Sequence, residues 1–397
     1  MKKDVLIIAQ FMGLESEGRN SRFTYIAKLI KDHYVEIVTS RFNHQKKDFR
    51  DKKILFESNY RVTLIDEPGY KKNVCLKRLY SHYILSKNIK KYLKQRKKPD
   101  VIYCSIPSLS VANIVSKYAQ KNKIPFIIDI QDLWPEAFKM VFKIPLFKDI
   151  LFYPMQRQAD SIYKRADKVV AVSNTYLNRA LKVNKKDPKG LVVFLGTDLQ
   201  IFDDYVQQSN IKKPDDEFWI VYIGTLGHSY NIPCVIEAIA IANKKIYDKI
   251  KFIVMGDGPL KDVFEKKAQE LGIYCEFTGR LPYKDMVQIL CKCDIAVNPI
   301  IKGSVASIIN KVNDYAAAGL PVINTLENKE YQNLLAKYNA GINCENNSLV
   351  LAETILKLYK DKQLIQTMGK NNRLLAEDYF DRDKTYFHIV KLINQMI

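Results

Sequence analysis

The segment 307–323 has the sequence Ser307-Ile-Ile-Asn-Lys-Val-Asn-Asp-Tyr-Ala-Ala-Ala-Gly-Leu-Pro-Val-Ile323. Asn310 is a residue type that caps helix N-termini, and the three alanines that follow favour a helix. Gly319 suits the left-handed position that ends a helix, and Pro321 prevents the helix from continuing. The apolar residues after the proline predict a buried strand. The segment therefore predicts a short capped helix that leads into a strand.

The start of this helix carries one cation and one carboxylate. Lys311 and Asp314 are three residues apart, so they share a helical face. The free amide groups of residues 310–313 and the positive end of the helix dipole lie beside Lys311. Such a helix start can bind a diphosphate and a neighbouring sugar diol, which is the chemistry of a nucleotide-sugar site. The alternative is a capped, alanine-rich helix whose two charges point into water.

The chain is 397 residues long, which exceeds one hydrophobic core of ordinary size and predicts two domains. No apolar run approaches the roughly 18–20 residues that cross a bilayer. The N-terminus has a short apolar run beyond Asp4, which predicts a first strand and not a signal peptide. Seven irregularly spaced cysteines fit a reducing cytoplasm, and Cys291 with Cys293 lacks the further ligands of a metal site.

The net charge of +20 arises entirely in the first half of the chain. Residues 1–200 hold 39 Lys and Arg against 19 Asp and Glu, whereas residues 201–397 hold 24 of each kind. We therefore expect the first half to meet an anionic membrane or an acidic ligand. A basic nucleic-acid-binding protein is a rival interpretation, but the sequence has no RRM, KH or zinc signature.

Strand-like apolar runs alternate with helix-period segments throughout, which predicts βαβ units around parallel sheets. The polar stretch 207–217 has the composition of a joint between two such domains. The predicted strands are 5–9, 35–39, 62–65, 101–104, 126–130, 169–172 and 191–194 before the joint, and 219–223, 251–255, 274–278, 295–299, 322–325 and 341–344 after it.

The segment 307–323 resembles the P-S-K-x-x-E-Y-x-A-x-G-x-P-V signature of glycosyltransferase family 4, which contains retaining enzymes of the GT-B architecture. Residues 100–107 and 128–137 resemble D-V-I-x-x-S-x-P and R-D-x-W-P-E segments of one branch. That branch makes capsule, O-antigen and related exopolysaccharides and includes N-acetyl-L-fucosamine transferases. Further segments follow in the family's order at 166–173, 195–198, 222–227, 256–259, 277–280 and 293–299.

The resemblance implies an α/β fold of the GT-B class, with two Rossmann-like doubly wound domains that face a central cleft. Residues 1–200 would form the basic, membrane-facing acceptor domain, and residues 201–375 the donor domain for the nucleotide sugar. Residues 376–397 would form a C-terminal helix that packs back on the N-terminal domain.

The resemblance also assigns the donor site. Lys311, as the catalytic cation, and Asn310 would bind the donor phosphates, while Arg280 and Leu281 would lie near the nucleobase. Asp314 matches the acidic residue that binds the ribose hydroxyls, although the family usually has the longer Glu there.

The first Glu of the family's pattern would fall at Ala306 in this chain. We expect Ser304 or Ser307 to take over its contacts to the donor sugar.

Two glycine-containing loops complete the predicted binding surface. Gly224, Thr225 and His228 follow a strand and would form a tight loop under the phosphates, although glycines serve an ordinary turn equally well. His228 stands where many relatives have Arg, and an imidazole is the weaker phosphate partner. The glycines of 256–258 predict a structural turn.

In the first half, Gly18, Arg19 and Arg22 resemble the family's Gly-rich loop that approaches donor phosphates or acceptor; a solvated loop is the alternative. Asp132 follows a buried strand and is the candidate catalytic base, because Gln131 stands where many relatives have His. The leaving phosphate is the alternative proton acceptor. The chain has one D-x-D, at 381–383, where it would flank the last helix, so we expect no metal.

Two segments combine apolar and basic residues in a pattern suited to a membrane surface. One is Lys71–Lys98, whose leucines, isoleucines and tyrosines would form an apolar stripe, and the other is Phe138–Met155. The alternative is that each stripe packs on its own domain.

These inferences predict a metal-independent retaining glycosyltransferase at the cytoplasmic face of the plasma membrane. It would move an N-acetylated 6-deoxyhexosamine, such as N-acetyl-L-fucosamine, from a UDP-sugar to an undecaprenyl-diphosphate-linked saccharide in capsule or O-antigen synthesis. The alternatives are a UDP-sugar epimerase or hydrolase of the same fold, a non-catalytic nucleotide-sugar sensor, and the nucleic-acid-binding protein.

Overall fold

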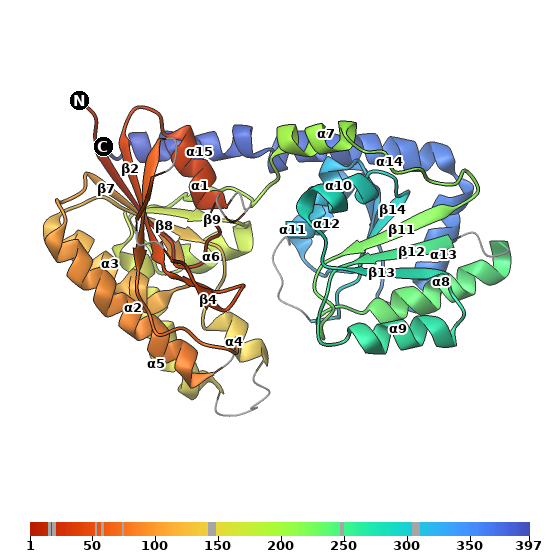
Figure 1. Cartoon of the computed structure of the whole chain (residues 1–397), viewed down its shortest axis with the longest axis horizontal. Coiled ribbons are helices and arrows are strands. Elements are labelled where there is room, and N and C mark those ends of the chain that lie inside the picture. Colours follow the sequence, from red (N-terminus) through yellow and green to blue (C-terminus); the bar gives the residue numbers. More distant parts are fainter. Residues whose placement is uncertain are drawn as a thin grey trace. The chain divides into compact units, whose positions relative to one another are not determined.

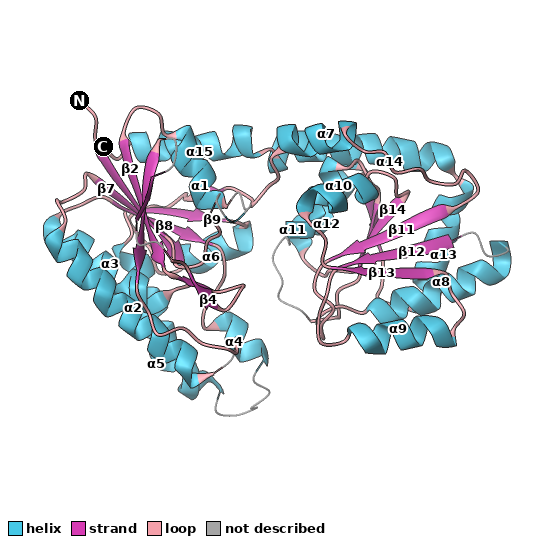
Figure 2. Cartoon of the chain, viewed as in Figure 1, coloured by secondary structure: helices cyan, strands magenta, loops and turns pink. Residues whose placement is uncertain are grey.

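The chain forms two compact units in the computed structural model (Figures 1 and 2). The N-terminal unit consists of Met1–Val193 and Tyr386–Ile397, and the C-terminal unit of Phe194–Thr385. The structure describes residues 1–14, 17, 21–51, 54–56, 59–73, 75–141, 148–246, 250–303 and 310–397.

The N-terminal unit alternates strands and helices as the sequence predicts. Its described elements are β1 (Asp4–Ile8), α1 (Arg22–Leu29), β2 (Tyr34–Ser40), β3 (Phe42–Asn43), β4 (Asp48–Phe49), β5 (Ile54–Phe56), β6 (Tyr60–Ile65), α2 (Leu76–Gln95), β7 (Val101–Ile106), α3 (Leu109–Asn122), β8 (Phe126–Ile130), α4 (Glu136–Val141), α5 (Lys148–Arg165), β9 (Lys168–Ala171), α6 (Asn174–Leu181) and β10 (Leu191–Val192).

The main sheet of this unit has the strand order β10-β9-β8-β7-β1-β2-β6-β5. All pairs are parallel except β5 with β6, which is antiparallel. The order reverses between β1 and β7, and a ligand of such a sheet binds beside the carboxyl ends of the strands at this point. Helices α2, α3 and α5 lie together along one flank of the unit (Figure 1).

The C-terminal helix α15 (Arg382–Asn394) completes the core of the N-terminal unit. Its residues Tyr386, Ile389 and Ile393 are buried and pack with α1 and with the strand residues Val5 and Ile7. The ring of Tyr386 meets that of Tyr25 edge-on, with 5.6 Å between the centroids. Burial of this apolar face holds the C-terminus of the chain against a sheet formed by its first two hundred residues.

A buried ion pair joins α1 to the centre of this sheet. Arg22 and Asp129 are 4% and 0% exposed, and the Arg22 Nε donates to Oδ2 of Asp129 at 2.7 Å. The Arg22 guanidinium also donates to the carbonyl of Val193 at 3.1 Å, and the hydroxyl of Tyr103 donates to Asp129 at 2.8 Å. Because both charges are shielded from water, each is stabilised mainly by its attraction to the other.

The C-terminal unit has the elements α7 (Leu199–Gln207), β11 (Phe218–Ile223), α8 (Ile232–Ile246), β12 (Ile250–Met255), α9 (Lys261–Glu270), β13 (Cys275–Gly279), α10 (Tyr283–Leu290), β14 (Ile295–Asn298), α11 (Asn310–Ala317), β15 (Val322–Asn324), α12 (Lys329–Tyr338), β16 (Gly341–Asn343), α13 (Ser348–Lys360), α14 (Lys362–Leu375) and the π-helix η2 (Ala376–Phe380).

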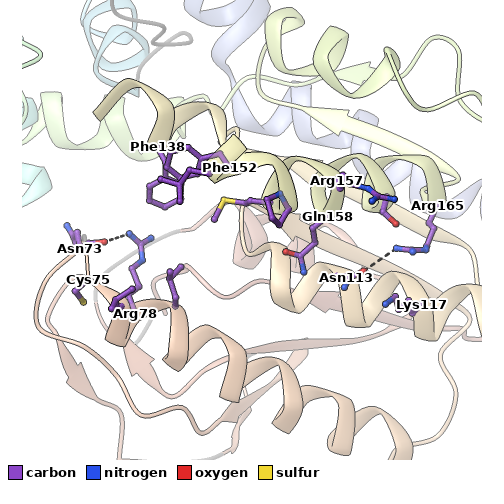
Figure 3. A pocket seen from close by; sticks show the side chains of 16 residues that line it. Asn73, Cys75, Arg78, Asn113, Lys117, Phe138, Phe152, Arg157, Gln158 and Arg165 are labelled. Carbon is purple, nitrogen blue, oxygen red and sulfur yellow. Dashed lines mark hydrogen bonds between the residues drawn. The ribbon is translucent and has the colours of Figure 1, made fainter. Parts of the chain in front are cut away.

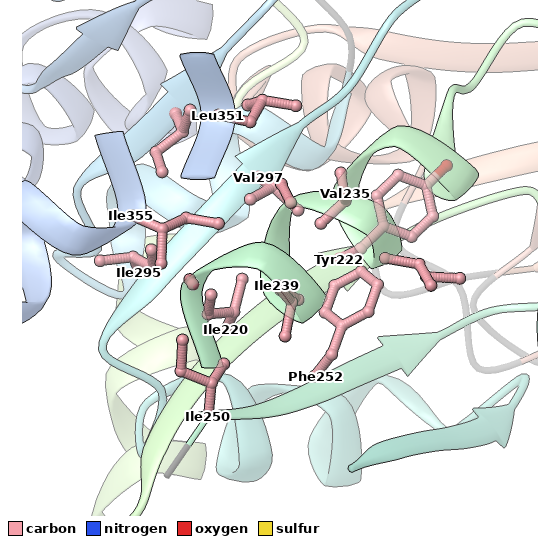
Figure 4. Packing of buried hydrophobic residues seen from close by; sticks show 14 of the residues in the cluster. Ile220, Tyr222, Val235, Ile239, Ile250, Phe252, Ile295, Val297, Leu351 and Ile355 are labelled. Carbon is pink, nitrogen blue, oxygen red and sulfur yellow. The ribbon is translucent and has the colours of Figure 1, made fainter. Parts of the chain in front are cut away.

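Its sheet is wholly parallel, with the order β13-β12-β11-β14-β15-β16. Helices α8 and α13 cover one face, where apolar side chains of the helices meet those of β11, β12 and β14 (Figure 4). The strand order reverses between β11 and β14, so the carboxyl ends of these two strands define the ligand position of this unit.

The division between the units falls at residues 193 and 385, not at 200 and 375 as the sequence suggests. The predicted joint 207–217 lies inside the C-terminal unit. Its neighbour α7 packs on α10, and Asp203 in α7 forms an ion pair with Arg373 in α14 at 2.7 Å. These long-range contacts attach the polar stretch to the second core.

We predict that Asp129→Ala lowers the free energy of unfolding by roughly 3–5 kcal/mol, because it leaves the Arg22 guanidinium buried and unpaired. The double variant Arg22→Met/Asp129→Leu should recover more than half of the loss. Urea unfolding measures both. Asp203→Ala, which breaks an ion pair that is partly exposed, is the matched control and should cost less than about 1 kcal/mol.

Candidate functional site

Three loops lie side by side at the carboxyl ends of β11, β12 and β13. The amide of Gly224 donates to the carbonyl of Met255, and the amide of Gly256 donates to the carbonyl of Gly279, both at 2.9 Å. A Cβ atom on Gly256 would lie only 1.8 Å from the carbonyl oxygen of Gly224. Glycine alone allows this approach of backbone to backbone, so Gly256 has the structural role that the sequence predicts.

A pocket of about 210 Å³ opens between these loops. It brings together four of the predicted donor-site residues, Gly224, Thr225, Arg280 and Leu281. Arg280 is exposed and has no acidic partner among the described residues, so its charge is available to a ligand. The remaining lining residues are Ile223, Met255, Gly256, Asp257 and Met286. Asp257 and Met286 are additions that the sequence did not single out as ligand contacts.

Lys311 is a buried cation beside this pocket. It is 7% exposed, and its Nζ would lie 3.1 Å from a Cβ atom on Gly224. The rings of Tyr222 and Tyr230 lie 3.9 and 4.0 Å from the Nζ, a geometry in which aromatic faces stabilise an ammonium. The Nζ has no hydrogen-bond partner among the described residues, and burial places the pKa of Lys311 well below its ordinary value.

The two aromatic contacts do not compensate for the burial of this amine. Removing an ammonium from water costs several kcal/mol, whereas a cation–π contact contributes about 0.5–2 kcal/mol. A buried donor without a partner is rare in folded proteins and calls for an explanation. An anion that enters beside Gly224 would supply the missing partner.

Asp314 lies on the same helix as Lys311 but faces different partners. Its Oδ1 accepts hydrogen bonds from the Tyr283 hydroxyl at 2.8 Å and from the Thr197 hydroxyl at 3.0 Å. Burial raises the pKa of Asp314, and these hydrogen bonds oppose the shift. The carboxylate is thus positioned on one oxygen, while Oδ2 takes part in neither bond.

Two details of the predicted donor site differ in the structure. Asn310 is the first residue of α11 and not its cap, so the capping prediction is wrong. The predicted end of the helix is confirmed, because Gly319 has a φ of +64°. His228 lies exposed in the turn after β11 and does not line the pocket with Gly224.

The predicted phosphate loop of the N-terminal unit is corrected in one respect. Arg22 cannot meet a ligand, because its guanidinium is enclosed with Asp129 inside the core. Gly18, Arg19, Ser304 and Ser307 lie outside the described residues.

Asp132 stands at the carboxyl end of β8, two residues beyond the last strand residue. Its Oδ1 accepts from the amide of Leu133 at 2.9 Å, and its Oδ2 accepts from the Trp134 indole at 3.2 Å. Burial raises the pKa of Asp132, which makes the carboxylate a better proton acceptor than a solvated Asp. Asp132 therefore lies at the carboxyl edge of the sheet, which is the edge where ligands of such sheets bind.

An aromatic cluster that sequence reasoning missed surrounds Arg78 next to Asp132. The Arg78 guanidinium lies 4.9 Å from the Trp134 ring, 5.5 Å from Phe11 and 5.6 Å from Tyr70. Its Nε is buried without a hydrogen-bond partner among the described residues. These rings come from segments far apart in the sequence, so no local pattern indicates the cluster.

The apolar stripe predicted for Lys71–Lys98 has two outcomes along α2. Its later residues Leu85, Ile89 and Leu93 are buried, as the packing alternative predicts. Its first turns instead expose four large apolar side chains, and α5 exposes three more near its own start. The exposed side chains are Leu76, Leu79, Tyr80 and Tyr83 in α2 and Ile150, Leu151 and Tyr153 in α5.

Among the described residues, no helix has the length and apolar character needed to cross a membrane. In the same part of the chain, no group of three or more His, Cys, Asp or Glu is placed to hold a metal ion. The segment 381–383 flanks the start of α15, as the sequence predicts. There the Asp381 carboxylate accepts a hydrogen bond from the amide of Asp383 at 3.0 Å.

Two family models together match most of the chain. Residues 24–200 match the model of Glycosyltransferase Family 4, and residues 204–375 match that of Glycosyl transferases group 1. The chain therefore belongs to the glycosyltransferases, and it carries the family 4 domain in its N-terminal half.

Two curated relatives are distantly similar. The chain is 26% identical over 298 residues to an alpha-1,4-N-acetyl-D-galactosaminyltransferase of Campylobacter jejuni, covering 74% of this chain and 73% of the relative. The printed name of that enzyme gives its acceptor as a saccharide on PP-undecaprenol. The chain is also 23% identical to a glycosyltransferase of Methanocaldococcus jannaschii, over 59% of this chain and 60% of the relative's length.

Solved structures share the fold over the full length of the chain. HepE of Anabaena, solved in complex with UDP, matches with a TM-score of 0.72 and 15% identity over 99% of this chain and 100% of that one. Sucrose-phosphate synthase of Thermosynechococcus elongatus matches with a TM-score of 0.70 and 16% identity, over 100% and 99%. The glycosyltransferase WaaG has a TM-score of 0.67 and 15% identity, over 98% and 99%. The predicted GT-B fold is confirmed.

We predict that Lys311→Met stabilises the ligand-free protein by roughly 1–3 kcal/mol, because it removes a buried polar group that has no partner in the described part of the chain. The melting temperature should rise by a few degrees, at about 2–4 °C per kcal/mol for a domain of this size. Differential scanning calorimetry measures the change. A variant less stable than the parent would contradict the assignment of an unsatisfied buried amine.

The sign of the pH dependence provides the control for this prediction. Between the lowered folded pKa of Lys311 and its ordinary value, the unfolded chain binds a proton that the folded chain does not. Stability therefore rises with pH across this window, and Lys311→Met should remove that part of the slope.

Proposed function

We propose that this protein is a retaining, metal-independent glycosyltransferase that transfers a sugar from a UDP-sugar to a lipid-linked saccharide. The observation that carries the proposal is the Nζ of Lys311, which lies beside the Gly224 loop and has no hydrogen-bond partner among the described residues. A departing diphosphate needs positive charge, and a positioned cation in a site shielded from water provides it efficiently. Lys311 would therefore gain its partner when the donor binds.

The other residues of the predicted donor site fit a nucleotide. Arg280 and Leu281 lie in one pocket with Gly224 and Thr225, a size and lining compatible with part of a nucleoside diphosphate. In this proposal Oδ2 of Asp314 accepts hydrogen bonds from the ribose hydroxyls, while the hydrogen bonds from Tyr283 and Thr197 hold Oδ1 in place. Asn310, exposed at the start of α11, offers its amide to the phosphates.

Relatives support the classes of donor and acceptor. HepE was solved with UDP, and the Campylobacter jejuni enzyme acts on a saccharide attached to PP-undecaprenol. We propose an undecaprenyl-diphosphate-linked acceptor here, and an N-acetylated 6-deoxyhexosamine such as N-acetyl-L-fucosamine as the transferred sugar. Capsule or O-antigen synthesis is the process that would use such a transfer.

The N-terminal unit would hold the acceptor at the inner face of the plasma membrane. Its surplus of positive charge favours an anionic membrane surface. Within this unit Asp132 would accept the proton of the attacking hydroxyl, or orient that hydroxyl while the leaving phosphate takes the proton.

We predict that UDP without added metal raises the melting temperature of the protein, and that Lys311→Ala abolishes the shift. The physical reason is that the Lys311 ammonium is the buried charge nearest the loop that would cradle the diphosphate. A thermal-shift series with UDP, GDP and their sugars, with and without EDTA, provides the measurement.

An unchanged melting temperature with every nucleotide would refute the proposed donor site. Asp314→Asn is the second variant in this series. It should weaken the binding of UDP more than the binding of inorganic diphosphate, because diphosphate has no ribose. Turnover of UDP-sugar that does not depend on a saccharide acceptor would instead indicate a hydrolase or epimerase.

For the acceptor side, we predict that Asp132→Asn lowers the rate of sugar transfer by about 10²–10⁴-fold if Asp132 is the general base. The UDP-induced thermal shift should not change, because Asp132 belongs to the N-terminal unit. Transfer is measured with a lipid-linked saccharide and labelled donor. Full activity in the variant would indicate that the departing phosphate, and not Asp132, accepts the proton.

A further inference from the structure

A groove of about 1,000 Å³ lies in the N-terminal unit between α2, α3, α4 and α5 (Figure 3). Apolar side chains from α2, α4 and α5 line much of it, among them Leu79, Phe138 and Leu151. Leu79 and Leu151 are 47% and 59% exposed, although each belongs to a helix that packs on the core. An apolar surface of this extent in water marks a binding site more often than a gap in packing.

The charged side chains that line the groove are all basic among the described residues. They are Arg78, Lys117, Arg157 and Arg165, and no described Asp or Glu lines the groove. Arg165 donates to Asn113 and Ser116 at 3.2 and 3.3 Å, and these neutral contacts leave its charge uncompensated. The lining therefore complements a molecule that is both apolar and anionic.

Arg78 lies at the end of the groove next to the Trp134 ring. Figure 3 shows Asn73 and Arg78 on one side and Phe138 across from them. One guanidinium nitrogen of Arg78 donates to the carbonyl of Asn73 at 2.7 Å, while its Nε has no partner in the described part of the chain. The same guanidinium lies 4.9 Å from the Trp134 ring, and the Trp134 indole donates to Asp132. Arg78 thus connects the groove to the candidate base.

We propose that this groove binds the polyisoprenoid chain of the lipid-linked acceptor, with the diphosphate on Arg78. The inference rests on the proposed function, since it names the place where that acceptor's lipid would lie. The saccharide would then extend from the diphosphate toward Trp134 and Asp132. Each methylene equivalent of the chain that leaves water contributes about 0.8 kcal/mol, so a few isoprene units suffice for specific binding.

The alternative occupant is the bilayer itself, with α2 and α5 lying on its surface. Two adjacent residues of α5 separate these possibilities. Leu151 lines the groove, whereas Ile150 does not, and both are exposed, at 59% and 71%. A surface that meets a membrane would use both side chains, but a groove that holds one chain would use only Leu151.

The experiment titrates farnesyl diphosphate, at concentrations where it is monomeric, into full-length protein carrying Trp219→Phe. This change leaves Trp134 as the one tryptophan, and the Trp134 ring contacts Phe138 of the groove at 4.7 Å between centroids. We expect saturable change of fluorescence, an affinity at least tenfold weaker in Leu151→Glu, and an affinity within twofold of the parent in Ile150→Glu.

Two further probes test the role of Arg78. Farnesol lacks the diphosphate. Arg78→Gln should therefore weaken the binding of farnesyl diphosphate at least tenfold and the binding of farnesol much less. Inorganic diphosphate lacks the chain and should bind equally to the parent and to Leu151→Glu. The melting temperature of every variant is checked first, and the paired variants at 150 and 151 keep the comparison valid when Arg78→Gln affects stability.

Equal loss in Leu151→Glu and Ile150→Glu would overturn the proposal, as would binding to phosphatidylglycerol vesicles without binding to farnesyl diphosphate. The UDP-induced thermal shift of the parent is measured in parallel. Its absence would refute the donor site and not the groove, so the two proposals fail separately.

Discussion

The proposed donor pocket depends on one contact, the approach of the loop after β12 to the backbone of the loop after β11. Any side chain on Gly256 would overlap the carbonyl of Gly224, so the loops meet only because position 256 is glycine. This contact continues the parallel sheet beyond its strands and forms the walls of a pocket at the carboxyl ends of β11, β12 and β13. It also places the Gly224 loop against the end of the Lys311 side chain.

Two buried cations in this chain show how burial separates structure from function. Arg22 has a buried carboxylate, a carbonyl and a tyrosine ring as partners, and it joins α1 to the sheet. Lys311 has only aromatic faces within the described residues. A satisfied buried charge costs the folded state little, whereas an unsatisfied one destabilises it and is tolerated where a ligand completes it. The sequence suggests a ligand role for both residues, and only the geometry tells them apart.

The charge asymmetry between the two halves has a structural counterpart. The neutral half carries the proposed donor pocket with the buried Lys311 beside it, and the basic half carries the groove between α2 and α5, which four basic side chains line. A small anionic nucleotide needs few charges held firmly, because low local dielectric strengthens each one. A large amphiphile needs apolar area together with a positive field that attracts it. The two units thus fit two different kinds of substrate.

The sequence by itself determined the alternation of strands and helices, the GT-B class and four of the residues that line the proposed donor pocket. Period and turn residues are local signals, so the long strands and the helix end at Gly319 were predictable, whereas β3, β4 and β5, of two or three residues each, were not. Tertiary structure alone decided that Arg22 pairs with Asp129, which is 107 residues away in the sequence. It further decided that α7 belongs to the C-terminal unit. It also decided that the exposed turns of α2 and α5 line one groove. These outcomes depend on contacts between distant segments, and no local pattern encodes which distant residue will become a neighbour.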